Sequence, residues 1–145
     1  MQLQIFQVDA FTDKVFGGNP AAVCPLQNWL PNDVMQRIAM ENRVAETVFF
    51  IPSGDDFEIR WFTPEIEMDL CGHATLAAAH VITRLLNPTL STLNFHSQSG
   101  LLTVMVENEL LTLNFPSRMP EPCNVPQLIL NAFLEQPIET LKSRD

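Results

Sequence analysis

The stretch DLCGHATLAAAH, residues 69–80, contains two of the three histidines and one of the three cysteines in this 145-residue chain. A helix is predicted to begin within it, because the residues after Gly72 are small or apolar and carry no charge before Arg84. The first N–H groups of a helix lack partners and carry a partial positive charge. The N–H groups of Gly72 and His73 could therefore bind an anion such as a carboxylate.

The same stretch also has a purely structural interpretation. Asp69 would cap the helix, Cys71 would pack as a small apolar side chain, and His73 would be an ordinary polar residue of the first turn. The residues of this stretch do not decide between the two interpretations.

Glu46 is the second residue whose position indicates chemistry. It stands at the head of the strongly apolar segment TVFFI, residues 47–51. Partial burial there would favour the neutral form of the carboxyl group and would suit it to taking up and returning protons. The alternative is that Glu46 points into water, as most glutamates do.

Metal and nucleotide chemistry is not expected. His73 and His80 lie two turns apart on one face of the predicted helix, about 10 Å along its axis, which is too far to bind one ion. The sequence has no H-E-x-x-H, C-x-x-C, G-x-G-x-x-G or G-x-x-x-x-G-K pattern. We therefore expect no metal site and no cofactor.

Composition limits the class of protein. The formal net charge is −9, and the eight Lys and Arg residues form no basic patch, so no nucleic-acid partner is expected. Three cysteines without a close pair favour reduced thiols. The N-terminus lacks the pattern of a signal peptide, and no apolar run is long enough to span a membrane. These features predict a soluble, cytoplasmic protein.

Short segments with alternating apolar and polar residues predict a sheet. The expected strands lie at residues 2–8, 47–51, 57–61, 92–97, 101–106 and 110–115. Polar breaks of hairpin length favour antiparallel neighbours. An amphipathic helix is predicted over residues 32–42, and the helix over 73–86 is apolar or small on every side, which predicts complete burial. The pattern indicates an α+β domain in which a curled, mostly antiparallel, barrel-like sheet surrounds a central helix.

The composition changes after residue 115. Four prolines between residues 116 and 126 predict a connector, followed by a short helix over 125–134 and the entry to another strand in 137–145.

Four blocks of the sequence together resemble the phenazine-biosynthesis (PhzF-like) isomerase family. They are QVDAFTDKVFGGNPAAV at 7–23, MQRIAMENRVAETVFF at 35–50, IRWFTPEIEMDLCGHATLAAAH at 59–80 and LKSRD at 141–145. The resemblance implies the diaminopimelate epimerase-like fold, in which two similar domains enclose an active-site cleft. Because the family's proteins are about twice as long, residues 1–116 are interpreted as the N-terminal domain, and 117–145 as a connector and the start of a second, largely absent domain.

The resemblance also implies roles for individual residues. Glu46 matches the family's proton-transferring glutamate, and His73 matches the histidine of its substrate pocket. The N–H groups of Gly72 and His73 would bind the substrate's carboxylate, and Asn19 would belong to a turn that lines the cleft. The implied activity is a cofactor-independent, biosynthetic isomerisation of a small carboxylate, aromatic or cyclic and amino-acid-like, by a homodimer. This chain alone is expected to be inactive, because the second domain closes the cleft.

Two other functions remain open. Amino-acid epimerases and racemases of this fold use a cysteine thiolate at the same helix start as a base, and Cys71 occupies that position. However, His73-Ala74 stands where the epimerases have Asn-Gly, and the second cysteine they need has no match, since Cys123 lies in the connector. The third possibility is a non-catalytic binding protein, or an inactive fragment of the fold.

Overall fold

The computed structural model describes residues 2–114, 116–133 and 137–143. The chain forms two compact units, Met1–Phe115 and Pro116–Asp145, which are described separately. That the second unit begins another epimerase-like domain stays a prediction.

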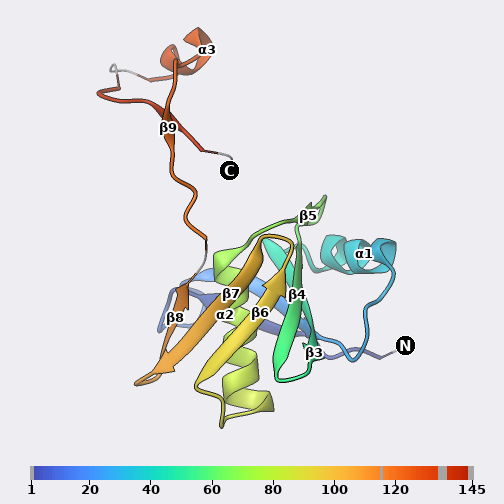
Figure 1. The fold of residues 1–145 in the computed structure, drawn as a ribbon. Helices are drawn as coiled ribbons and strands as arrows, with labels where there is room; N and C mark the ends of the chain where they lie inside the picture. The colour runs from blue at the N-terminus through green and yellow to red at the C-terminus, as the bar shows by residue number, and fades with distance from the viewer. Residues whose placement is uncertain (1, 115, 134–136, 144–145) are drawn as a thin grey trace. The chain divides into compact units, whose positions relative to one another are not determined.

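The first unit is built on one curled sheet (Figure 1). The strand order is β1-β2-β3-β4-β6-β7-β8, and the short β5 pairs with β4. The bounds are Phe6–Ala10 (β1), Asn19–Pro25 (β2), Glu46–Ser53 (β3), Asp56–Phe62 (β4), Glu67–Met68 (β5), Thr92–Ser97 (β6), Gly100–Glu107 (β7) and Leu110–Asn114 (β8). Neighbours are antiparallel except for the parallel pairs β2–β3 and β4–β6. The predicted curled, mostly antiparallel sheet is therefore confirmed.

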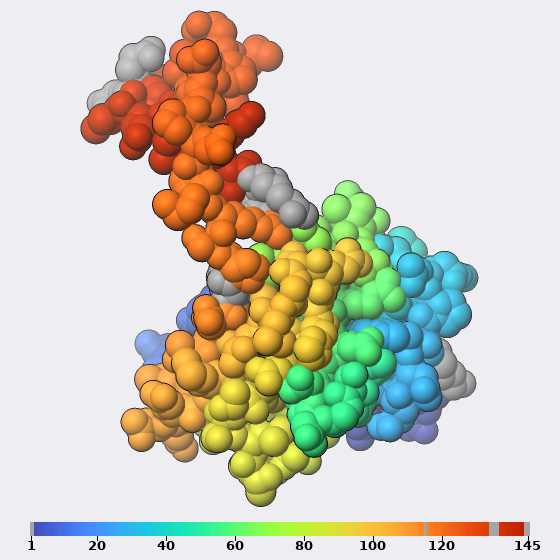
Figure 2. Space-filling view, in the orientation of Figure 1, coloured from blue at the N-terminus to red at the C-terminus, as the bar shows by residue number. Residues whose placement is uncertain are grey.

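Helix α2, Gly72–Val81, runs through the concave side of this sheet and continues as a π-helix, Ile82–Leu86 (Figure 1). In the space-filling view, β4, β6 and β7 cover the helix. The segment at the C-terminal end of the helix emerges below these strands (Figure 2). Ala74, Ala77 and Ala78 are almost wholly buried, and these small side chains let the strands approach the helix. A larger residue at one of these positions would cost about 1–3 kcal/mol through overpacking.

The strands contribute alternate residues to the core around α2, as the period of two requires. These residues include Val48 and Phe50, Ile59 and Trp61, Leu93 and Phe95, and Leu102 and Val104. Between the inward residues of β4, Glu58 and Arg60 face away from the core, as the sequence pattern predicted.

Helix α1, Asn32–Asn42, packs on the other face of the sheet. Its Met35 and Ala39 join Cys24, Phe49 and Phe62 in a second, smaller core cluster. The predicted amphipathic helix is confirmed with the same bounds. Its apolar side packs on this cluster, as an amphipathic pattern requires.

The segment around Asn19 differs from the expectation. It was predicted as a turn, but Asn19 begins β2, which runs parallel to β3. A parallel pair needs a long crossover connection, here through α1, and short-range sequence patterns do not reveal it. Gly18 precedes this strand, and a Cβ there would lie 2.2 Å from the carbonyl oxygen of Ala10. Only glycine permits this close approach of the two chain segments.

Helix α2 is also less enclosed than predicted. His80 is exposed and Leu76 is half-buried. Both line a groove of about 840 Å³, together with residues of β1, the loop after it, the turn between β7 and β8 and the start of β8. Strands β1 and β8 are the two ends of the sheet, so the helix face between these ends is left open.

The second unit contains β9 (Glu121–Pro122), α3 (Gln127–Leu130) and β10 (Leu141–Lys142). The helix lies within the predicted range but is shorter, and β10 falls within the segment predicted to enter a strand. Strands β9 and β10 form an antiparallel pair. Across the described parts of both units, no helix combines the length and apolar character that crossing a membrane requires.

Candidate active site

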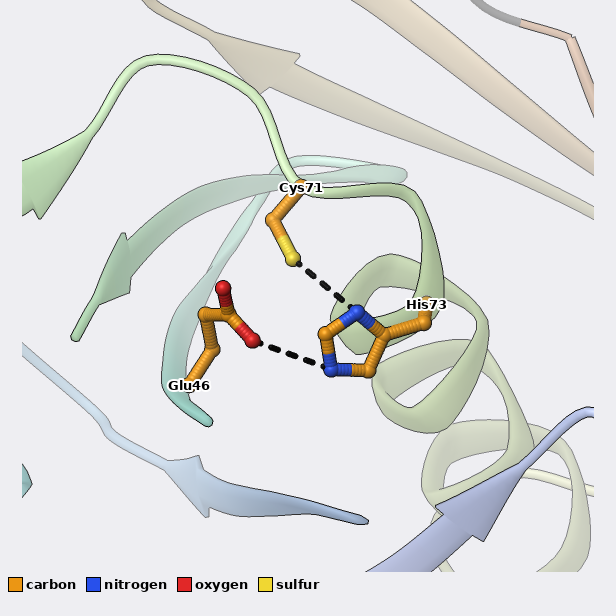
Figure 3. A group of neighbouring side chains, drawn as sticks. All are labelled: Glu46, Cys71 and His73. Carbon is orange, nitrogen blue, oxygen red and sulfur yellow. Dashed lines mark hydrogen bonds and ion pairs between the residues drawn. The ribbon is translucent and has the colours of Figure 1, made fainter. Parts of the chain in front are cut away.

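Three side chains from two segments meet at the start of α2 (Figure 3). Glu46 is the first residue of β3, Cys71 is the N-cap of α2, and His73 lies in its first turn. The Nε2 atom of His73 is 3.1 Å from Oε2 of Glu46, and its Nδ1 atom is 3.5 Å from Sγ of Cys71. The imidazole ring thus lies between a carboxyl group and a thiol.

The connection between α1 and β3 positions Glu46. Helix α1 ends at Asn42. The next residue, Arg43, has a left-handed backbone (φ 53°) that turns the chain towards the sheet, and its N–H donates to the Ala39 carbonyl. Asn42 Nδ2 then donates to Oγ1 of the buried Thr47, at 3.1 Å. These bonds fix the residues on both sides of Glu46.

Two hydroxyl groups hold the start of α2. Thr75 Oγ1 donates to the Cys71 carbonyl at 2.6 Å, one turn along the helix. Ser99 Oγ, from the turn between β6 and β7, donates to the carbonyl of Asp69 at 2.8 Å. The segment that carries Cys71 and His73 is therefore attached to the sheet as well as to the helix.

A half-buried ion pair holds the strand that precedes this segment. The guanidinium of Arg60 binds both carboxylate oxygens of Glu67, each at 2.7 Å, and Gln98 Nε2 donates to Glu67 Oε1 at 3.0 Å. This two-point geometry fixes β5, from which the chain continues into the loop before α2. The sequence analysis missed Arg60 and Glu67 because their contact depends on β4 and β5 folding back on each other.

The site is shielded from solvent. The side chain of Glu46 is 18% exposed and that of His73 is 10% exposed. Glu46 Oε2 and His73 Nε2 are buried atoms, and neither makes a hydrogen bond of good geometry with any described residue. The two atoms are 3.1 Å apart and form an ion-pair contact. Each of them can still form a hydrogen bond with another group. Buried polar atoms in this condition are uncommon, and a bound ligand is one way in which their hydrogen-bonding capacity can be satisfied.

The thiol of Cys71 is held in its neutral form. Burial raises its pKa from 9.0 to about 12, and the charge of Glu46 acts in the same direction. The backbone N–H groups of Ala74 and His73, at the helix start, act against this shift but do not cancel it. A thiol with this pKa is almost fully protonated at neutral pH and is a poor base.

Glu46, Cys71 and His73 also form a group of possible metal ligands, with donor atoms within 4.8 Å of one another. The thiol lies against Nδ1 and the carboxylate against Nε2, however, and an imidazole ring offers only one of its nitrogens to a given ion. The arrangement suits a chain of proton-bearing groups better than a shared ion.

The structure brings some of the predicted site residues together but not all. Glu46, Cys71, Gly72 and His73 are clustered. Cys71, rather than Asp69, occupies the N-cap position of α2, and its side chain makes no capping hydrogen bond. Asn19 lies at the same end of the sheet, because Ala21, two residues further along β2, pairs with Glu46. Asn19 takes no part in the contacts that join the other three side chains.

The remaining histidines lie elsewhere. His80 is on the open groove, where partial desolvation of its ring and the nearby charge of Arg84 lower its pKa. His96, on β6, contacts Asp56 on the surface. The groove of about 840 Å³ thus contains His80 but not Glu46 or His73.

Comparison with known proteins identifies the relatives of this chain. Residues 8–136 match the family model described as phenazine biosynthesis-like protein. An uncharacterized isomerase of Pseudomonas aeruginosa is 48% identical over the whole chain, which covers 56% of that protein. The crystal structure of a PhzF-family protein from Enterococcus faecalis is 45% identical, with a TM-score of 0.88, and the chain covers 56% of it.

A more distant solved structure supports the fold alone. It is a predicted epimerase from Pseudomonas aeruginosa, 24% identical, with a TM-score of 0.70, covering 86% of this chain and 46% of that one. The epimerase-like fold predicted from the sequence is therefore confirmed. The chain spans about half the length of the relatives it matches.

Proposed function

We propose, because this chain belongs to the phenazine biosynthesis-like (PhzF) family, that it supplies one half of the active site of a cofactor-independent isomerase. The observation that carries this proposal is the shielded pair of Glu46 and His73, 3.1 Å apart, with buried polar atoms that lack good hydrogen bonds. Relatives of the chain are named isomerases, which supports an isomerase at the level of the family.

Glu46 is the proton-transferring group in this proposal. Its carboxylate takes a proton from a carbon of the substrate, and the electron pair of that C–H bond remains on the substrate as a delocalised anion. The resulting carboxylic acid then returns the proton to a different carbon, which moves a double bond and regenerates the carboxylate. One glutamate can perform both steps because it is close to the substrate and shielded from bulk water.

The start of α2 binds the substrate in this proposal. Its first N–H groups, from Gly72 and His73, carry the positive end of the helix dipole, and the N-cap residue Cys71 makes no side-chain capping hydrogen bond. A carboxylate placed there lies beside Glu46, because His73 belongs to the first turn of the helix and its side chain contacts Glu46. The proposed substrate is a small aromatic or cyclic, amino-acid-like carboxylate.

The rest of the site lies outside this chain. Because the chain covers 56% of its Enterococcus relative, we infer that a second half of similar fold closes the pocket and that the chain alone is inactive. We also propose a cytoplasmic homodimer as the working form of the enzyme.

A chimera in which this chain is joined to the C-terminal half of the Enterococcus relative tests this proposal. The chimera is incubated in deuterated water with a panel of cyclic and aromatic amino carboxylates, and deuterium uptake into each compound is measured by mass spectrometry. We expect exchange in the chimera and none with the isolated chain. Absence of exchange in a folded chimera with every compound would favour a non-catalytic binding protein instead.

A cysteine-dependent epimerase is the second candidate, since Cys71 Sγ lies 3.5 Å from the ring of His73. The raised pKa of this thiol argues against its use as a base. In the chimera, Cys71→Ser and Glu46→Gln distinguish the two reactions. Loss of exchange in Cys71→Ser, with exchange kept in Glu46→Gln, would reverse our assignment.

A further inference from the structure

The thiol of Cys71 contacts the ring nitrogen of His73 that faces away from Glu46 (Figure 3). Sγ lies 3.5 Å from Nδ1, while Nε2 faces the Glu46 carboxylate at 3.1 Å. A thiol, an imidazole and a carboxyl group therefore follow one another through the site. The isomerisation proposed above uses Glu46 and His73 but gives this thiol no task.

The protonation of the thiol determines which of the two groups donates the hydrogen bond. Burial holds the pKa of Cys71 at about 12, so at neutral pH the sulfur carries a hydrogen that it can donate. A neutral imidazole has one nitrogen that donates and one that accepts. When the thiol donates to Nδ1 of His73, the ring hydrogen must be on Nε2, on the side of the ring where the Glu46 carboxylate lies 3.1 Å away.

The opposite arrangement is unfavourable while Glu46 is ionised. A hydrogen on Nδ1 would point at the sulfur, which is a weak acceptor. The lone pair of Nε2 would then face a carboxylate oxygen 3.1 Å away, with both atoms buried. Two acceptors placed together without water are costly.

We propose that Cys71 is a positioning residue, whose S–H donates to Nδ1 and thereby holds His73 in the tautomer that presents an Nε2–H to Glu46. The proposal rests on the proposed function for its catalytic importance, but the tautomer itself belongs to the isolated chain. In this role the thiol never loses its hydrogen, in contrast to the thiolate base of an epimerase.

Nitrogen NMR of the histidine rings tests this directly in the 145-residue chain. With only three histidines, ¹⁵N-histidine labelling gives three ring systems, and His80→Gln and His96→Gln identify two of them. At pH 8, two-bond ¹H–¹⁵N correlations show which nitrogen of His73 carries the hydrogen. We expect Nε2–H, with the Nδ1 resonance displaced from the position of a nitrogen that accepts no hydrogen bond.

Variants of the thiol then establish its part. Cys71→Ala removes the donor to Nδ1 and should abolish the displacement of the Nδ1 resonance, while Cys71→Ser, which keeps a donor, should restore the wild-type pattern. Cys24→Ala is the matched control, because Cys24 is also a buried thiol but belongs to the cluster under α1. It should leave the His73 ring unchanged.

Two results would overturn the proposal. One is a wild-type His73 ring with its hydrogen on Nδ1, which needs no variant to interpret. The other is an unchanged His73 ring in a folded Cys71→Ala chain. Both are read without substrate, so an inactive enzyme would refute the proposed function and leave this inference standing.

The chimera supplies the functional readout. Loss of one neutral hydrogen bond corresponds to about fivefold in rate, so Cys71→Ala should lower kcat about fivefold with KM nearly unchanged. Cys71→Ser should restore kcat. A rise in KM alone, with kcat kept, would assign Cys71 to substrate binding and contradict the positioning role.

Discussion

Among the described residues, two histidine–carboxylate pairs have nearly equal N···O separations but very different surroundings. His73 Nε2 lies 3.1 Å from Glu46 Oε2, and His96 Nε2 lies 2.9 Å from Asp56 Oδ2. The side chains of the first pair are 10% and 18% exposed, and those of the second are 53% and 33% exposed. The separation of the two groups therefore does not distinguish a candidate site from a surface contact.

What distinguishes the pairs is the use of their remaining hydrogen-bonding capacity. Asp56 accepts from Asn94 Nδ2 at 3.0 Å as well as contacting His96, and Asn94 in turn accepts from Thr103. Glu46 and His73 have no such supporting bonds at their facing atoms and are shielded from water. The surface pair is already satisfied, while the shielded pair has polar atoms that a substrate can bind.

The largest expected difference between the pairs is in catalysis. In the chimera, Glu46→Gln should lower the rate of deuterium exchange by about 10²- to 10⁴-fold, because the amide cannot take up the substrate's proton. Asp56→Asn makes the same chemical change in the surface pair and should leave the rate unchanged. Equal effects of the two substitutions would show that neither pair is the proton-transferring site.

The thiol beside the shielded pair gives the next largest effect. With a pKa of about 12 in place of 9.0, Cys71 has about a thousandfold less thiolate at pH 8 than an ordinary thiol. Iodoacetamide should therefore label Cys123 much faster than Cys71 or Cys24, whose pKa burial raises to about 11. Intact mass and peptide mapping after timed labelling measure the rates.

Unfolding the chain provides the control for this experiment. In urea the rates at the three cysteines should converge, since burial is then lost. Rapid labelling of Cys71 in the folded chain would mean that its thiolate is accessible, which would revive the cysteine-dependent reaction.

The smallest effect concerns the stability of the surface pair. Hydrogen bonds from His96 and Asn94 hold the pKa of Asp56 below its ordinary value of 3.8. A carboxyl group with a lowered folded pKa contributes stability above 3.8, and this contribution is lost as pH falls through the folded value. The difference in Tm between wild type and Asp56→Asn should thus be modest near pH 7 and should disappear once the pH falls well below 3.8. A difference that grew on acidification would mean that Asp56 is stabilised in its neutral form.

Local patterns predicted the elements of the first unit better than their connections. The alternation in FEIRW identified β4 and its inward face, and the run of small residues after Gly72 identified the central helix. Both signals depend only on neighbouring residues and the repeat of the backbone. Strand β2 was not predicted, because its pairing with β3 depends on a crossover through α1.

The candidate site was predictable only as separate residues. Glu46 drew attention because it precedes an apolar strand, and Cys71 and His73 because of the helix start, while the resemblance to a family connected them. Cys71 and His73 are close in the sequence, but which ring nitrogen the thiol contacts depends on side-chain geometry. The anchoring of the helix start by Ser99 and by the Arg60–Glu67 pair joins segments that are distant in the sequence.

The sequence by itself determined a curled sheet around a thin helix, because apolar periodicity and small residues require a particular burial wherever the chain folds. It also determined which groups can carry protons. Only the tertiary structure decided which histidine faces which carboxylate, and which of the two pairs is kept from water. That difference arises because burial and hydrogen-bond satisfaction are properties of all the elements packed around a group, and no single segment encodes them.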